Sequence, residues 1–99
     1  MNMQNLMAQA QKIQKEIQKK QSEIDSTIFT GKSDFVSVEV YGTKKIHKLN
    51  INKDVLNDKE DLDMLEDMIT IAINSAFSQV DKEIEKKLGS YGKGLNGLI

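Results

Sequence analysis

The chain contains no cysteine, no tryptophan and no arginine. Without cysteine it cannot form disulfide bonds, thiolate zinc sites or a cysteine nucleophile. No apolar run approaches the roughly 20 residues that a membrane-spanning helix requires, and no signal-peptide pattern opens the sequence. We therefore expect a cytoplasmic protein with no contact to a membrane.

Aromatic residues are also scarce. They make up 5% of the 99 residues, and hydrophobic residues of all kinds make up 38%. This length suits one small domain without room for a second core. So few large apolar side chains give a thin core, and the composition therefore favours assembly with a partner chain.

The groups that catalysis needs are sparse. His47 is the single histidine, and we expect it in a strand opposite Val38, partly packed and without a nucleophile at hairpin or helical spacing. The carboxylates of residues 58–63 lack the alternating ligands and the glycine of a calcium loop. No glycine-rich phosphate loop precedes a helix. We expect no enzyme activity, no metal, no cofactor and no small-molecule substrate.

Charge is nearly balanced overall but unevenly placed. The net charge is −1, yet residues 1–22 carry four lysines against one glutamate, and residues 54–67 carry seven carboxylates against one lysine. The carboxylates favour the positive end of a helix dipole near residue 58, and this structural reading is favoured over a functional one. Every cation is a lysine, which is a point charge without the bidentate fork of arginine.

Residues 3–24 have the spacing of a helix. Their apolar side chains recur in steps of three and four, as in a coiled-coil seam, and the residues between them are good helix formers. Lys12, Lys15 and Lys19 fall together on the opposite face. The seam consists of Met3, Leu6, Ala10, Ile13, Ile17 and Ile24.

The middle of the chain is extended. Residues 26–31 form a short β-rich run, and residues 35–41 alternate so that Val36, Val38 and Val40 fall on one face. Gly42-Thr43 suits a two-residue type II′ hairpin turn, after which residues 44–51 return as the partner strand. Counted back from this turn, Val40 pairs with Lys45, Val38 with His47, and Val36 with Leu49.

A second helix is predicted over about residues 58–88, with Asn57 and Glu60 as a capping pair at its start. One broad apolar face suits the core, but Met64, Met68 and Ile71 point the other way. A second copy of the chain is the simplest cover for this stripe, because closed two-fold dimers are the commonest assemblies. The alternative is that the three residues pack under the strand-to-helix loop.

The last segment, residues 89–99, contains four glycines. Glycine disfavours a helix. We therefore expect a single domain of residues 1–88 followed by a flexible tail, in which Leu95, Leu98 and Ile99 are available for docking.

Together these elements predict an α+β fold, in which a helix, a three-stranded antiparallel sheet and a long helix follow one another. Both helices are longer than such a sheet is wide, so their ends overhang it and form a two-helix arm. Met3, Leu6 and Ala10 of the first helix are expected to meet a stripe on the second, which consists of Phe77, Val80, Ile84 and Leu88.

The lysines indicate a ligand. In a two-fold dimer with one arm per subunit, each lysine cluster would be present twice. The two arms together would then form a clamp that binds the phosphates of duplex DNA. Each cluster taken alone is also explained as a solvated face, so both readings stay open. The candidate DNA-binding residues are Lys12, Lys15, Lys19, Lys44, Lys48, Lys82, Lys86 and Lys87.

Four stretches follow one another over nearly the whole chain: NLMAQAQKIQKEIQ, a strand ending LNIN, DKEDLDMLEDMITIAINSAF and GKGLNGLI. In these stretches the chain resembles the YbaB/EbfC family of bacterial nucleoid-associated proteins. None of them is a catalytic motif. The resemblance rests most on Leu65-Glu66-Asp67 followed by Ala72, Asn74 and Ala76, and next on Asn5-Leu6-Met7 with Gln9, Ala10 and Gln11.

The resemblance implies a tweezer-shaped homodimer that binds DNA with little sequence preference and influences nucleoid organisation. Two departures matter: Asn52-Lys53 stands where the family usually has Asp-Pro, and only lysine is present where relatives use arginine. The second departure argues against base-specific readout more than against backbone binding. The alternative is a scaffold or a holdase resembling prefoldin, which would use the same helix arms without DNA.

Overall fold

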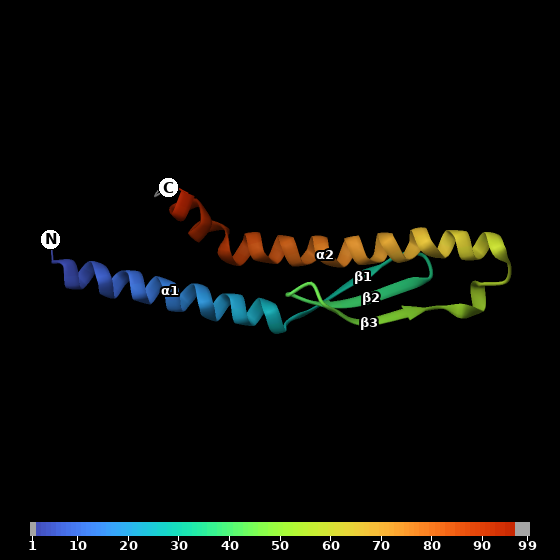
Figure 1. The fold of residues 1–99 in the computed structure, drawn as a ribbon, viewed down its shortest axis with the longest axis horizontal. Coiled ribbons are helices and arrows are strands. Elements are labelled where there is room, and N and C mark those ends of the chain that lie inside the picture. The colour runs from blue at the N-terminus through green and yellow to red at the C-terminus, as the bar shows by residue number, and fades with distance from the viewer. Residues whose placement is uncertain (1, 97–99) are drawn as a thin grey trace.

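The computed structural model describes the backbone of residues 2–96 and the side chains of residues 2–91. Helix α1 (Met3–Ser26) leads into strands β1 (Ile28–Lys32), β2 (Val36–Tyr41) and β3 (Ile46–Ile51), and a 3-10 turn, η1 (Lys53–Val55), precedes helix α2 (Lys59–Asn96). The molecule is a rod of 72 × 23 × 14 Å, with the sheet along one side of α2 and α1 projecting beyond the sheet (Figure 1). This arrangement confirms the predicted α+β fold with overhanging helices.

The core lies between the sheet and α2. The sheet is antiparallel with the order β1-β2-β3, and α2 packs across β1 and β2. Val36, Val38 and Val40 point toward the helix, as their alternation predicts, and are at most 2% exposed. On the helix they meet Ala72, Ala76 and Val80. Full burial of a valine contributes about 1.5–3 kcal/mol, so this small cluster carries much of the stability.

Two glycines set how closely the sheet approaches the helices. A methyl group on the Cα of Gly31 would overlap the carbonyl oxygen of Ala72 and the amide nitrogen of Ala76, so β1 can lie this close to α2 only with glycine. Gly42 lies in the same way against the carbonyl group of Ile24, at the end of α1. Both glycines are therefore explained by close packing.

The β2–β3 loop differs from its prediction. It has three residues, 42–44, and the backbone N–H of Tyr41 donates to the carbonyl oxygen of Lys45 across it, at 2.9 Å. Lys44 adopts a left-handed conformation with φ of 64°, whereas Gly42 does not have the positive φ that a type II′ turn requires. Three-residue loops that end in a left-handed residue are a common type of hairpin connection. The predicted two-residue turn is therefore wrong.

The strand register changes with the loop. Val40 pairs with Ile46, Val38 with Leu49 and Val36 with Ile51, and the ladder is irregular at Glu39/Val40. The predicted partners of the three valines are wrong by one or two residues, because the longer loop and the irregularity each shift the count. His47 lies in this irregularity and has no opposite residue in the ladder.

Helix α2 begins with a capping box. Asp58 Oδ1 accepts from the amide of Asp61 at 3.0 Å, and Asp61 Oδ2 accepts from the amides of Asn57 and Asp58 at 2.9 and 3.1 Å. Such reciprocal bonds satisfy amides that the first turn of a helix leaves free. The pair lies one residue later than the predicted pair of Asn57 and Glu60.

Helix α2 also ends later than predicted. It continues through Gly89 and Tyr91 to Asn96, so the predicted helix end at residue 88 is wrong. A glycine inside a helix costs about 1 kcal/mol, and the contacts of Tyr91 with α1 offset part of that cost. Leu98 and Ile99 lie outside the described residues, and the flexibility of segment 89–99 stays a prediction.

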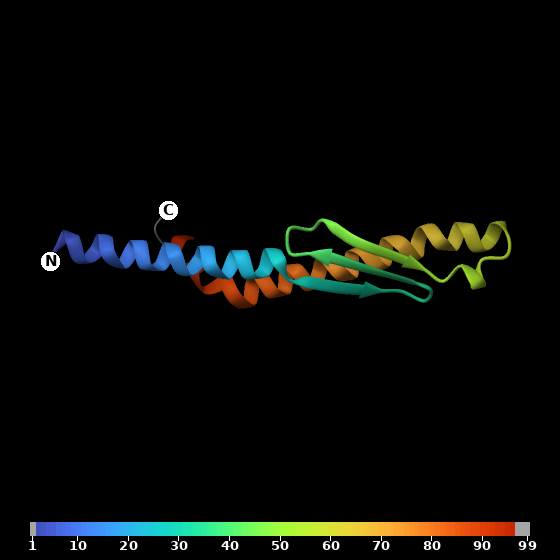
Figure 2. The same ribbon diagram turned by 90° about the horizontal axis from the view of Figure 1, so that it is seen from below.

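The two-helix arm has different contacts from those predicted. Helices α1 and α2 lie side by side only along the C-terminal part of each, and α1 projects past the end of α2 (Figures 1 and 2). Phe77 and Val80 belong to the core under the sheet, while Met3 and Leu6 are 74% and 47% exposed. The predicted contact between these two groups is therefore wrong.

Candidate nucleic-acid interface

An exposed lysine face runs along α1. Lys12, Lys15 and Lys19 are all exposed, and helical spacing directs them away from Ile17 and Ile24, which face the rest of the protein. Their positions span about 10 Å along the helix axis. Among the residues whose side chains are described, no carboxylate forms an ion pair with any of the three. They line a shallow groove with Ala8, Gln11 and Glu16.

A contact between the helices holds this face in place. Lys20 Nζ donates to the hydroxyl of Tyr91 at 3.1 Å and lies 4.8 Å from the centre of the tyrosine ring. The same hydroxyl donates to Glu16 Oε2 at 3.3 Å. Since Glu16 and Lys20 lie one turn apart, Tyr91 fixes both the distance and the rotation of α1 relative to α2. Tyr91 was not among the predicted site residues.

The lysines of α2 form a separate group. Lys82 and Lys86 are exposed and share one face of the helix. Both lie about 140–180° around the helix from Tyr91, so they are directed away from α1. Lys87 is half-buried and pairs with Glu83 at 3.6 Å. The structure therefore places the lysines of the two helices on opposite sides of the arm.

The hairpin lysines are also separated from each other. Lys44 Nζ contacts Asp81 Oδ1 of α2 at 2.9 Å and lies 5.7 Å from the ring centre of Phe77. Lys48 pairs with Glu39 across the sheet, on the face opposite α2. Lys44 and Lys48 therefore lie on different faces of the sheet, because the three-residue loop turns Lys44 toward the helix.

Two apolar surfaces stay uncovered on the body of the rod. Met64 and Ile71 are 47% and 49% exposed, and Met68 is half-buried. Ile46 and Leu49 on β3 are 50% and 43% exposed, because α2 covers β1 and β2 but leaves the inner side of β3 open. This second surface was not predicted, since a strand paired with the buried valines gives no sign that α2 leaves it uncovered.

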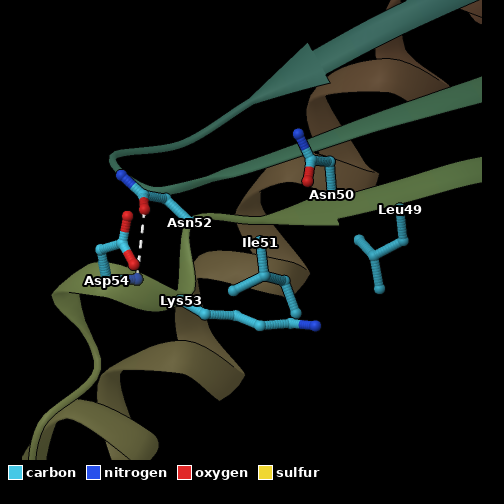
Figure 3. Close-up of a pocket in the computed structure, with 6 residues that line it drawn as sticks. All are labelled: Leu49, Asn50, Ile51, Asn52, Lys53 and Asp54. Atoms are coloured by element: carbon cyan, nitrogen blue, oxygen red, sulfur yellow. Dashed lines mark hydrogen bonds between the residues drawn. The ribbon is translucent and has the colours of Figure 1, made fainter.

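The uncovered part of β3 ends in a hollow that continues into η1 (Figure 3). Leu49 and Ile51 point to one side of the strand and Asn50 to the other. The Asn52 side chain accepts from the amide of Asp54 at 3.2 Å, and its backbone N–H donates to the carbonyl oxygen of Phe35 at 2.9 Å. These bonds hold the turn in the absence of the Asp-Pro pair.

Within residues 2–96, no helix is long and apolar enough to cross a membrane. The fold and the lysine face define the chain as a small α+β protein that presents a row of positive charge on a projecting helix. Comparison with known protein families identifies the family to which it belongs. The chain belongs to the YbaB/EbfC DNA-binding family, whose model matches residues 1–95.

Curated relatives are similar over almost their whole length. A nucleoid-associated protein of Lactococcus lactis subsp. cremoris (strain MG1363) is 53% identical over 97 residues, which cover 96% of this chain and 97% of the relative. One of Streptococcus pneumoniae (strain Hungary19A-6) is 46% identical over 93 residues, which cover 92% and 93%. The predicted family resemblance is confirmed.

A solved structure supports the fold. The crystal structure of the uncharacterized protein HP0035 from Helicobacter pylori has a TM-score of 0.69 to this chain and covers 100% of it, with 99% of that chain aligned. The sequence identity is 23%, so this likeness concerns the fold alone.

Proposed function

We propose that the protein binds duplex DNA in the bacterial nucleoid as a homodimer, through the phosphate backbone and with little sequence preference. The observation that carries this proposal is the lysine face of α1, where Lys12, Lys15 and Lys19 project together without carboxylate partners among the described side chains. The family and the nucleoid-associated relatives support DNA as the partner.

Lysine chemistry favours the backbone over the bases. An ammonium group meets a phosphate as a point charge, whereas bidentate recognition of guanine uses the guanidinium fork that this chain lacks. Lys48, Lys82 and Lys86 are exposed and add further contacts. Lys44 and Lys87 already pair with carboxylates, but such surface pairs are worth only about 0–1 kcal/mol, so a phosphate can replace them.

The net charge of −1 does not oppose this binding. The carboxylates of residues 54–67 lie at the end of the rod opposite the projecting part of α1 (Figure 1), and the rod is 72 Å long. Charges are largely screened beyond about 8–10 Å at physiological salt. The phosphates near α1 are therefore attracted by the local lysines with little repulsion from the acidic end.

The decisive experiment compares two charge reversals of equal size. Lys12→Glu/Lys19→Glu alters the lysine face, and Lys53→Glu/Lys59→Glu makes the same change in net charge on the body. In a gel shift at low salt with a duplex of arbitrary sequence, the first variant should bind at least about tenfold more weakly, because counterion release at those sites is lost. The control should stay within about threefold.

Two results would contradict the proposal. Equal losses in both variants would mean that overall charge, and not the α1 face, governs retention. A footprint confined to one sequence that survives about 300 mM salt would indicate base readout instead of backbone binding. A holdase would give a third pattern. Lys12→Glu/Lys19→Glu would keep most of its ability to prevent aggregation of an unfolded protein, and neither variant would change the retention of duplex DNA in the gel shift.

The homodimer is proposed to form through the stripe of Met64, Met68 and Ile71. Met64 and Ile71 are exposed, and Met68 is half-buried against the core beside them. Exposed apolar side chains gain free energy when a partner covers them, and a dimer would double the number of α1 lysines available to one duplex. The competing surface is the pair of Ile46 and Leu49 on β3.

Sedimentation of matched variants separates the two surfaces. Ile71→Glu should convert a dimer at low micromolar concentration into a monomer, because a buried unpaired carboxylate costs several kcal/mol, and Leu49→Glu should leave the dimer intact. The opposite result would move the interface to β3. A wild-type protein that is monomeric at these concentrations would refute the homodimer.

A further inference from the structure

The face of the sheet opposite α2 has no cover among the described residues. In Figure 2, which looks at the rod from below, the three strands lie in front of α2 with nothing over them. The side chains on this face alternate with the buried valines, so the registers fix which residues are neighbours. Ile28 lies opposite Tyr41, and Glu39 lies opposite Lys48.

Tyr41 and His47 form an aromatic pair on this face. The tyrosine hydroxyl and His47 Nδ1 are 2.9 Å apart, and the two rings meet edge to face with centres 4.9 Å apart. His47 is exposed and Tyr41 half-buried. The irregularity in the β2–β3 ladder places His47 beside Tyr41, and their bond fixes the orientation of both rings.

The same face of the sheet carries two lysines. Lys48 lies on β3 directly after His47, and Lys32 lies at the far end of β1, opposite Ser37. Both are exposed, as is Asn50, which lies opposite Ser37 on the other side. Glu39 is the single carboxylate on these strands, so the face carries a positive balance.

We propose that this face binds a short stretch of single-stranded DNA, with bases stacked on Tyr41 and His47 and phosphates held by Lys32 and Lys48. A flat sheet that combines aromatic rings with lysines suits unpaired bases, whose faces are free, and not a duplex, whose bases are stacked on each other. Three strands about 4.8 Å apart give a platform about 10 Å wide, enough for two or three nucleotides.

A second copy of the chain fits this face less well. Interface centres are depleted in charged residues, and a two-fold contact here would bring lysines of both copies together. The proposed site is independent of the α1 lysines, so it can exist whether or not the arm binds duplex DNA.

Tyrosine fluorescence provides a direct readout. The chain has two tyrosines and no tryptophan, so Tyr91→Phe leaves Tyr41 as the sole emitter. Thymidine octamer added to this variant should quench most of the emission through stacking, whereas an abasic octamer with the same phosphates should quench little. Equal quenching by the two ligands would overturn the proposal, as would binding of a uridine octamer without binding of the thymidine octamer.

Substitutions locate the site by an amide NMR titration with the same thymidine octamer. His47→Ala and Tyr41→Ala should each weaken binding about tenfold, and Tyr41→Phe, which keeps the ring, should lose much less. His47 is exposed, so its replacement leaves the fold intact and keeps the test valid if Tyr41→Ala is unstable. Unchanged affinity in His47→Ala would refute the site.

The Lys12→Glu/Lys19→Glu variant separates this site from duplex binding by the arm. It should keep full affinity for the octamer, and His47→Ala should keep full retention of duplex. Loss of octamer binding in Lys12→Glu/Lys19→Glu would place the octamer on the arm and refute the sheet site, without bearing on the duplex proposal.

Discussion

The ammonium group of Lys20 and the hydroxyl group of Tyr91 are 3.1 Å apart, although the two residues are separated by 71 positions in the sequence. Lys20 stands one turn after Glu16, the second partner of the same hydroxyl. The arm therefore depends on one tyrosine near the end of α2. The contact at Glu16 and Lys20 orients the lysine face of α1.

The first prediction concerns this contact. Tyr91→Phe keeps the ring but removes both hydrogen bonds, and we expect a loss of about 1 kcal/mol in the free energy of unfolding. In a double-mutant cycle in urea, Tyr91→Phe and Lys20→Met should couple by at least about 0.5 kcal/mol. Ser90→Ala, at the exposed neighbouring position, is the control. Additive losses would show that Lys20 and Tyr91 do not stabilise each other.

The second prediction tests the start of α2. Asp58→Ala should cost about 1 kcal/mol, because the side chain caps the amide of Asp61. For a chain of this size such a loss lowers the melting temperature by about 4–8 °C. Asn57→Ala should change it little, since the N–H of Asn57 donates to Asp61 from the backbone. A larger effect at Asn57 would restore the capping pair expected from the sequence.

The third prediction concerns the contact between β1 and α2. Gly31→Ala should destabilise the fold by about 1–3 kcal/mol or more, as overpacking of a core does. Ala76→Gly should fail to rescue it, because the added methyl group also overlaps backbone atoms of Ala72 and Ala76. Thermal unfolding by circular dichroism measures both effects. Thr30→Ala, at the exposed preceding position, is the matched control, and full rescue by Ala76→Gly would contradict the explanation.

The fourth prediction is the salt dependence of duplex binding. If six α1 lysines of a dimer contact phosphates, log K should fall against log salt with a slope of about −5. Lys12→Ala/Lys19→Ala removes four of these contacts from the dimer, and the slope should shrink to about −2. Fluorescence anisotropy over a salt series measures both values. A slope unchanged by these substitutions would mean that other lysines neutralise the phosphates.

Much of the fold could be predicted because its signals are local. The alternation of Val36, Val38 and Val40 indicates a strand with one buried face, and the helical steps of three and four need only a few neighbouring residues. The hairpin could not be predicted in the same way. Gly42 is explained by the carbonyl group of Ile24, which is close only after folding, and the left-handed residue is Lys44.

The candidate site likewise has a part that local sequence patterns predict and a part that depends on contacts formed only in the folded chain. Helical spacing alone places Lys12, Lys15 and Lys19 on one face. The pairing of Lys44 with Asp81 and the contacts of Tyr91 join residues far apart in the sequence, so no local pattern indicates them. The binding of DNA by these lysines stays a prediction until the charge reversals are measured.

The first turns of α1 have an energetic consequence of their own. Residues 3–13 leave Met3, Leu6 and Ile13 largely uncovered, so their helical state is propagated from the later turns and receives little support from packing. Isolated helices shorter than about 12–15 residues are only marginally stable in water. Fraying at the tip must therefore be suppressed when a ligand engages Lys12, and part of the interaction energy is consumed in ordering the backbone.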